Sequence, residues 1–250
     1  MNDTITQLFN LSGRTAVVTG AGRGIGRAIA LLLDQAGASV RAVARTQSDL
    51  DEINTVSRGR VEGWLQDVTQ PEFIAELDQM SSLDILINNA GTNRPQPFVE
   101  VDAETLDDVM TLNVSAMFKT AQAATRVMMK TSGGGSIINM SSQMGHIGSP
   151  NRSVYCMTKH AVEGLTKAMA VELAEHKIRV NAVAPTFIET PLTRPMLADP
   201  EFQTFVNRMI PLGKVGQPND VAAAALYLAS DASAMVTGHS LRVDGGWTAA

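Results

Sequence analysis

The stretch TAVVTGAGRGIG, residues 15–26, decides the fold of this chain. Its first five residues are a short apolar run rich in β-branched side chains, which is typical of a buried strand. A turn with four glycines follows, and apolar residues at helical spacing then run from Ala28 to Leu33. A strand, a glycine-rich turn and a helix in this order predict the first unit of an α/β sheet.

The glycine-rich turn is suited to hold a pyrophosphate group. Glycines permit a tight turn and a close approach of the backbone, and the helix that follows offers its N–H groups and the positive end of its dipole. The spacing is Thr-Gly-x-x-x-Gly-x-Gly, which differs from the general Gly-x-Gly-x-x-Gly fingerprint. Taken alone, the turn therefore predicts either a dinucleotide site or a plain glycine-rich connection.

The same alternation of strand and helix continues along the chain. Further strands are expected over residues 39–44, 60–66, 83–87, 136–140, 178–184 and 240–243, with helical patterns between them. This alternation predicts a parallel sheet with helices on both faces. Right-handed crossovers bring the carboxyl ends of all strands to one edge, where ligands bind in such folds.

Neither a repeat nor a Gly/Ser-rich linker divides the chain. We expect one domain over residues 12–250, preceded by a short polar lead-in at residues 1–11. Within the domain, four prolines interrupt residues 186–212, and short helical patches lie between them. This segment has the character of a lid or substrate loop over the edge of the sheet.

The composition excludes several classes of partner. The chain has 250 residues and a formal net charge of −5, so there is no electrostatic case for a nucleic acid or an anionic membrane as partner. No secretory signal is expected in MNDTITQLFN, and the apolar run at residues 222–229 is too short to span a bilayer. A single cysteine excludes an internal disulfide and fits a reducing compartment, so we expect a cytoplasmic protein.

The end of the second strand bears on the choice of cofactor. In a dinucleotide fold this strand end meets the adenosine ribose, where an acid binds the 2′-OH of NAD and an arginine accommodates the 2′-phosphate of NADP. Arg45 stands there, and Arg23 of the glycine turn points to the same neighbourhood, whereas Asp49 comes several residues later. The sequence therefore favours NADP over NAD, unless Arg45 is only a solvated loop charge.

Three further strand ends carry polar or small residues. Asp67, followed by Val68, either accepts a hydrogen bond from adenine or caps the helix that begins near Pro71. In Asn88-Asn89-Ala90-Gly91, the asparagines are expected to tie neighbouring loops, and the two small residues let a flat ring or a ribose lie against the backbone. The sixth strand ends at Pro185.

A hydroxyl, a phenol and an ammonium follow the fifth strand. Ser142 lies just past the strand, and Tyr155 and Lys159 are four residues apart on one face of a predicted helix. A phenol has a pKa of about 10, and a neighbouring ammonium lowers the pKa. Since a serine hydroxyl can hold the oxygen of a carbonyl or alcohol, these residues predict a site for proton transfer.

Asn113 lies on the apolar face of a long helical stretch, residues 103–129. A buried asparagine needs hydrogen-bond partners. Either it marks a helix kink held by a water molecule, or it is a link in a proton relay.

Taken together, these motifs resemble the short-chain dehydrogenase/reductase family, from about Ser12 to Trp247. The residues that carry the resemblance are Thr19–Gly26, Asp67-Val68, Asn88–Gly91, Asn113, Ser142, Tyr155-x-x-x-Lys159 and Asn181–Pro185. The resemblance implies a Rossmann-type, doubly wound, parallel seven-stranded sheet, a homotetramer, and NAD(P)-dependent interconversion of alcohols and carbonyls. One departure is Thr186, where the family usually has glycine and where some pentulose and diacetyl reductases look similar to this chain.

The resemblance also implies a role for each catalytic residue. Tyr155 is the general acid and base, and Ser142 orients the substrate oxygen. Lys159 lowers the Tyr155 pKa and holds the nicotinamide ribose, and Asn113 supports a water molecule leading away from it. The residues expected at the cofactor are Gly20, Arg23, Gly24, Ile25, Gly26, Arg45, Asp67, Val68, Asn89, Ala90, Gly91, Tyr155, Lys159, Pro185, Ile188 and Thr190.

The substrate has to be inferred from residues around the nicotinamide end. The candidates are Asn93, Arg94, Gln143, His146, Arg152 and Arg194. Their polarity suits a sugar or a polyol, and the arginines can pair with a carboxylate or lie at a surface or subunit contact. We expect a small hydroxylated substrate: a sugar, a polyol or a sugar acid such as a gluconate.

Two alternatives stay open. The motifs are shared with 3-oxoacyl-carrier-protein reductases, and the fold also suits a cofactor-binding regulator without turnover. The intact set of Asn113, Ser142, Tyr155 and Lys159 disfavours the regulator. The four histidines show no metal-ligand spacing, so no catalytic metal is expected.

Overall fold

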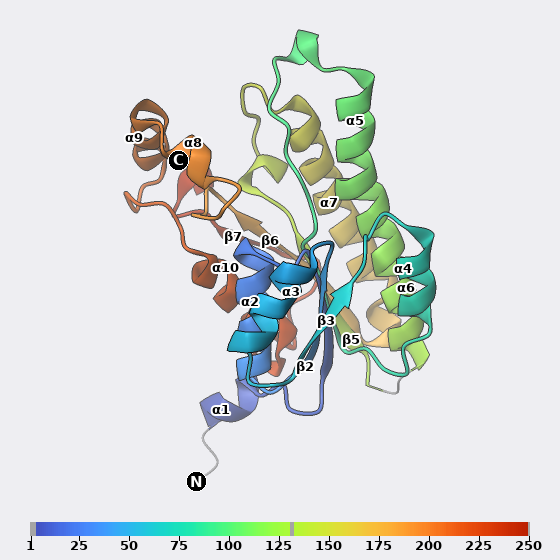
Figure 1. Ribbon diagram of the computed structural model, residues 1–250. Coiled ribbons are helices and arrows are strands. Elements are labelled where there is room, and N and C mark those ends of the chain that lie inside the picture. The colour runs from blue at the N-terminus through green and yellow to red at the C-terminus, as the bar shows by residue number, and fades with distance from the viewer. Residues whose placement is uncertain (1–3, 131–132, 250) are drawn as a thin grey trace.

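A seven-stranded parallel sheet forms the centre of the molecule (Figure 1). The computed structural model describes residues 4–130 and 133–249. The strands lie in the order β3-β2-β1-β4-β5-β6-β7, and every neighbouring pair is parallel. They are β1 Thr15–Thr19, β2 Ser39–Ala44, β3 Val61–Leu65, β4 Ile85–Asn88, β5 Gly135–Met140, β6 Ile178–Pro185 and β7 Ser240–Val243. The predicted doubly wound fold is confirmed.

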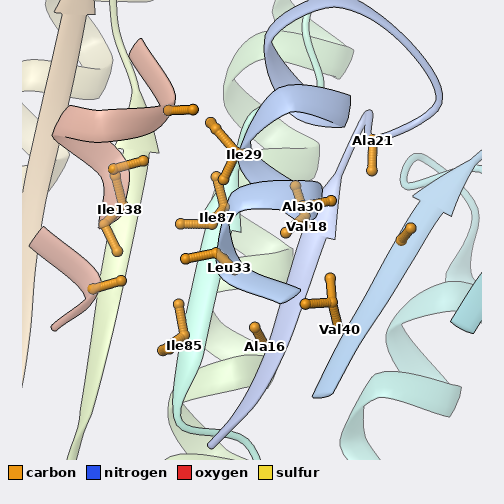
Figure 2. Close-up of a cluster of buried hydrophobic side chains, with 14 of the residues drawn as sticks. Ala16, Val18, Ala21, Ile29, Ala30, Leu33, Val40, Ile85, Ile87 and Ile138 are labelled. Carbon is orange, nitrogen blue, oxygen red and sulfur yellow. The ribbon is translucent and has the colours of Figure 1, made fainter. Parts of the chain in front are cut away.

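Helices cover both faces of this sheet because side chains alternate along each strand. Ala16 and Val18 of β1 pack on one face, where α2, α3 and α10 lie, and Val17 packs on the other, against α4, α6 and α7. Figure 2 shows Ile29, Ala30 and Leu33 of α2 against the first of these faces. The helices are α2 Gly24–Gln35, α3 Gln47–Val56, α4 Pro71–Asp78, α5 Ala103–Met110, α6 Met117–Lys130, α7 Ser153–Glu172 and α10 Pro218–Ala229.

The predicted helical stretch at residues 103–129 contains a break in hydrogen-bond register. Between α5 and α6 the segment η2, Thr111–Ala116, is π-helical. Single π turns inside helices are frequent at functional sites. Asn113 lies in this segment and is fully buried.

Two segments outside the alternating strands and helices of the sheet contain short helices. Residues 4–9 of the predicted polar lead-in form the helix α1, Thr4–Phe9, and residues 1–3 lie outside the described residues. The segment at residues 186–212 contains α8, Arg194–Leu197, and α9, Pro200–Met209. These helices have a small core of their own around Leu197, Val206 and Trp247. The role of residues 186–212 as a lid remains a prediction.

The order of the strands determines where a ligand can enter. The chain runs outward from β1 to β3, returns to β4 beside β1, and then continues to β7. Ligands of such sheets bind where this direction reverses, at the carboxyl ends of the strands. Throughout residues 4–130 and 133–249, no helix combines the length and the hydrophobicity needed to cross a bilayer.

Candidate active site

A cavity of about 440 Å³ opens at the carboxyl ends of the strands. Its walls are the glycine turn after β1, the ends of β2, β4, β5 and β6, and the loop that follows β6. Every residue that the resemblance assigned to the cofactor lines this cavity. The structure therefore brings that whole set together, and the contact of each one with a cofactor remains a prediction.

The glycine turn is tight because three of its positions have no room for a side chain or need a left-handed backbone. Gly20 and Gly24 have φ values of +64° and +57°. A Cβ atom at Gly26 would lie 2.2 Å from the Gly20 carbonyl oxygen. The turn is tied to β4 by Asn89, whose Nδ2 donates to the Thr19 and Gly20 carbonyls at 2.9 and 3.2 Å.

These features fit a dinucleotide pyrophosphate. Helix α2 begins directly after the turn, and its N-cap residue Arg23 provides no side-chain cap. The N–H groups of the first helical turn are therefore available to an anion. Within the described part of the chain, no three His, Cys, Asp or Glu side chains gather as metal ligands.

The outer end of the cavity carries charges of both signs. Arg45 is 71% exposed, and its Nη1 lies 3.6 Å from Asp67 Oδ2. Asp67 Oδ1 accepts hydrogen bonds from the Thr69 N–H and hydroxyl at 2.9 and 2.8 Å, so this carboxylate closes a local turn. Desolvation raises the pKa of Asp67, but the bonds from Thr69 and the charge of Arg45 outweigh it and lower the pKa below its usual value.

Asp49 is a cavity residue that the sequence reasoning set aside. It lies several residues past β2, but α3 begins at Gln47 and its first turn brings Asp49 back to the glycine turn. A Cβ at Gly22 would lie 2.8 Å from the Asp49 Cβ. The signal available in the sequence was the position of Asp49 in the first turn of a predicted helix. The acid therefore lines the same cavity as Arg23 and Arg45.

Ser142, Tyr155 and Lys159 meet at the inner end of the cavity. Ser142 follows β5 and caps η3, Gln143–Gly145, with its Oγ accepting from the Met144 N–H at 3.1 Å. The Lys159 ammonium donates to the Met140 carbonyl at 2.8 Å and lies 5.4 Å from the centre of the Tyr155 ring. The end of a strand and the first turns of a helix thus bring the three groups together, as their spacing predicts.

The acidity of Tyr155 differs from the expectation. Desolvation raises its pKa to about 12, and the hydrogen bond with Ser142 only partly opposes this. Desolvation lowers the pKa of Lys159 to about 8, against the charge of Glu163. The predicted lowering of the Tyr155 pKa by Lys159 is not found in this structure, because the ammonium is bound to the Met140 carbonyl and lies over the ring.

Asn113 is held by hydrogen bonds to other parts of the chain. Its Oδ1 accepts from the Thr92 N–H at 2.8 Å, and its Nδ2 donates to the Thr92 carbonyl at 2.8 Å and the Thr158 hydroxyl at 3.2 Å. It therefore links η2 to the loop after β4 and to α7. A Cβ at Gly91 would lie 3.2 Å from Asn113 Oδ1 and 3.8 Å from Lys159 Nζ. Its place in a proton relay stays a prediction.

Three of the predicted substrate residues face other partners. Arg94 pairs with Asp108 at 2.7 Å on the surface, and Arg194 lies 3.8 Å from Glu189. His146 Nε2 lies 3.0 Å from Ser240 Oγ and 3.2 Å from Glu163 Oε1. These three residues, like Gln143 and Arg152, are not among the residues that line the cavity, and the contact of each with a substrate stays a prediction.

The other predicted substrate residues remain near the reaction centre. Asn93 lines the cavity, and Gln143, beside Ser142, is 1% exposed. Buried atoms without a hydrogen-bond partner in the described chain include Asn93 Oδ1, both amide atoms of Gln143 and the Oγ1 of Thr186, a cavity residue. Because unpaired buried polar atoms are costly, the two groups that line the cavity, those of Asn93 and Thr186, are suited to bonds with a polar ligand.

Arg152 lies beside Tyr155. Of the three arginines predicted at the substrate, it is the one without a carboxylate partner among the described residues. Its guanidinium donates to the Asn151 carbonyl at 3.3 Å and to Met196 Sδ at 3.7 Å, which connects it to α8. Desolvation lowers its pKa, and the charge of Arg152 in turn lowers the pKa of Tyr155 slightly.

Comparison with known proteins adds independent findings. The family model described as enoyl-(acyl carrier protein) reductase matches residues 20–248. The L-xylulose reductase of Bos taurus is 43% identical, over 96% of this chain and 99% of its own. A 3-oxoacyl-[acyl-carrier-protein] reductase of Vibrio cholerae is 39% identical, over 95% and 98%. The solved gluconate 5-dehydrogenase of Burkholderia cenocepacia, in complex with NADP and tartrate, superposes with a TM-score of 0.92 at 34% identity, covering 98% of this chain and 99% of its own.

Proposed function

The chain belongs to the short-chain dehydrogenase/reductase family of oxidoreductases, and from this premise we propose that it interconverts a secondary alcohol and a carbonyl on a small sugar, polyol or sugar acid. The observation that carries the proposal is the convergence of Ser142, Tyr155 and Lys159 on a cavity that also contains unpaired buried polar atoms. Such atoms suit a substrate rich in hydroxyl groups.

The residues of the chain handle the proton and the position of the substrate. A bound nicotinamide nucleotide supplies or accepts a hydride. In reduction, the Tyr155 hydroxyl donates a proton to the substrate oxygen, and its pKa of about 12 keeps it protonated through the neutral range. The Ser142 hydroxyl holds the same oxygen, and the Lys159 ammonium stabilises the phenolate that forms.

A reductase for 3-oxoacyl thioesters is the second candidate, since a relative of that name is 39% identical. The unpaired atoms of Asn93 and Thr186, which line the cavity, favour the hydroxylated substrate instead. Turnover on small ketoses, polyols and sugar acids, compared with an acetoacetyl thioester and read at the nicotinamide absorbance, tests the choice. Turnover on the thioester alone would contradict the proposal.

Within this proposal, Arg152 selects for a carboxylate on the substrate. Replacing it with methionine is expected to raise KM for a sugar acid about tenfold, because a charge-assisted hydrogen bond contributes about 1.5–3 kcal/mol. KM for a neutral ketose should stay within about twofold, since surface-type changes away from a contact have small effects. Arg94→Met, which removes a surface partner of Asp108, is the matched control. Equal changes in KM for the sugar acid and for the neutral ketose would show that Arg152 supports the fold and does not bind the carboxylate.

The cofactor preference forms another part of the proposal. Arg23 and Arg45 at the outer end of the cavity support NADP, and solved relatives contain NADP. The double change Arg23→Ala and Arg45→Ala is expected to raise Kd for NADPH by about tenfold or more, because it removes charged donors to a phosphate. NADH, which lacks that phosphate, should be little affected. Fluorescence titration measures both, with Arg58→Ala in the loop after α3, where the residue is exposed, as control. A parallel loss for NADH would contradict the preference.

We include a homotetramer in the proposal. The helices on one side expose large apolar side chains: Leu106 on α5, Phe118 on α6, and Met157 and Val171 on α7. Helices α5 and α7 lie side by side (Figure 1). Exposed large apolar side chains on neighbouring helices support association of copies of the chain.

A further inference from the structure

A buried carboxylate on α7 has no part in the proton transfer described above. Glu163 lies four residues after Lys159, so the two side chains leave the same face of the helix. The Glu163 side chain is 7% exposed. A carboxylate is rarely buried unless it is paired, because its desolvation is costly.

The partners of Glu163 come from two other elements. Its Oε1 accepts a hydrogen bond from the Ser240 hydroxyl of β7 at 2.9 Å. His146, directly after η3, places Nε2 3.2 Å from the same oxygen and 3.0 Å from Ser240 Oγ. One carboxylate oxygen therefore connects the edge strand, the turn that begins at Ser142, and the helix that carries Tyr155 and Lys159.

The turn can approach the helix this closely because residue 145 is glycine. A Cβ at Gly145 would lie 3.0 Å from the Lys159 carbonyl oxygen and 3.1 Å from Glu163 Cγ. It would also lie 2.7 Å from the hydroxyl of Ser141, the residue before the catalytic serine. The Glu163 cluster is thus packed directly behind the reaction centre.

Few charged groups surround Lys159 besides Glu163. The titratable neighbours on α7 are Tyr155, Cys156 and the exposed His160, with Arg152 just before the helix and His146 after η3. Strand β5 and segment η2 contain no titratable residue, and Arg179 of β6 donates to the Leu228 and Ser230 carbonyls. The acidic residues of α5, Glu104, Asp107 and Asp108, are exposed. Among these groups, Glu163 is therefore the buried acid that lies nearest to Lys159 in the sequence and on the same face of the helix.

We propose that Glu163 is an electrostatic positioning residue, which keeps Lys159 an ammonium in its desolvated site and fixes the Ser142 turn against α7. The inference rests on the proposed function, since it assigns Lys159 its catalytic charge. The charge of Glu163 opposes the desolvation that lowers the Lys159 pKa to about 8. Glu163 acts through Lys159 and touches neither substrate nor cofactor.

The test compares Glu163→Gln with the parent protein. Glutamine keeps the shape and an acceptor oxygen for Ser240 but loses the charge. Removing a negative charge lowers the pKa of a neighbouring ammonium, so Lys159 should lose its proton at a lower pH, by about one unit. The first readout is the pH titration of the labelled Lys159 side chain by NMR in the cofactor-free protein, with the signal assigned by its loss in Lys159→Met. The second is the alkaline limb of kcat/KM for reduction, which should move in the same direction.

Matched variants separate charge from packing. Glu163→Asp keeps a carboxylate and should restore the midpoint, and Glu172→Gln, at the exposed end of α7, should leave it unchanged. Should Glu163→Gln fold poorly, Glu163→Met with Ser240→Ala removes charge and donor together and predicts the same shift. Identical NMR midpoints in the parent and in the folded charge-free variants would overturn the inference. Absence of turnover in the parent protein would instead overturn the proposed function. The NMR titration would still test the effect of Glu163 on Lys159, because it does not depend on turnover.

Discussion

Replacing Tyr155 with phenylalanine is expected to lower kcat about 10²–10⁴-fold in either direction, since this is the usual contribution of general acid–base catalysis. The substitution removes the hydroxyl that we assign as proton donor to the substrate oxygen, and it keeps the ring against Lys159. Binding of NADPH should therefore change little. Steady-state rates and fluorescence titration measure the two quantities.

The chain has two tyrosines, which supplies a matched control. Tyr227 lies on α10, away from the cavity, and Tyr227→Phe should keep the parent rate. Full activity of Tyr155→Phe would contradict the assigned acid. Loss of NADPH binding together with activity would show that the ring, rather than the hydroxyl, is the important group.

Replacing Gly26 with alanine is expected to abolish tight cofactor binding and to lower stability. The new Cβ would lie 2.2 Å from the Gly20 carbonyl oxygen, which is a backbone atom, and 2.5 Å from Asn89 Nδ2, which is held by hydrogen bonds to the Thr19 and Gly20 carbonyls. The turn has to move, at a cost of about 1–3 kcal/mol, typical of overpacking, and more where the backbone is displaced. This cost corresponds to a rise of roughly ten- to a hundredfold in Kd for NADPH.

Gly164 provides the control for this substitution. It is exposed within α7, and a Cβ there meets no atom within 4 Å. Gly164→Ala should stabilise the protein by up to about 1 kcal/mol, because alanine favours the helix. Titration with NADPH and thermal unfolding measure both variants. Parent-like binding by Gly26→Ala would show that the turn is not the pyrophosphate site.

The fold could be predicted because its signals are local and repeated. Residues 15–26 specify a strand, a turn and a helix through hydrophobic period and glycine alone, and the same pattern recurs in each unit. The topology rules of parallel sheets then bring Gly20, Asn89, Ser142 and Pro185 to one edge. These residues are far apart in the chain, and only the sheet connects them.

The sequence failed where a side chain has several partners within reach. Arg94 and Arg194 were expected at the substrate, but Asp108 and Glu189 lie nearby in the fold and pair with them. Asp49 was set aside for its distance from β2, because its return depends on where α3 begins. Such competition between partners is decided by tertiary geometry, which spacing does not report.

The pKa values of Tyr155 and Lys159 could not be predicted from the sequence either. The four-residue spacing of Tyr155 and Lys159 predicts proximity, and proximity alone suggests a lowered phenol pKa. The structure adds desolvation, which raises the Tyr155 pKa to about 12 and lowers that of Lys159 to about 8. The π-helical segment at Asn113 and the bonds of this residue to Thr92 and Thr158 likewise became visible only in the packed structure.

The transfer of a labelled hydride tests the central claim most directly. NADPH that carries deuterium at the reactive position of the nicotinamide is incubated with a small ketose and the protein, and the product is analysed by mass spectrometry and NMR. A single deuterium on the new carbinol carbon of a polyol, formed by the parent protein and at least about a hundredfold more slowly by Tyr155→Phe, is the predicted result. Unlabelled product, or label transferred only to a 3-oxoacyl thioester while ketoses and sugar acids stay untouched, would contradict it.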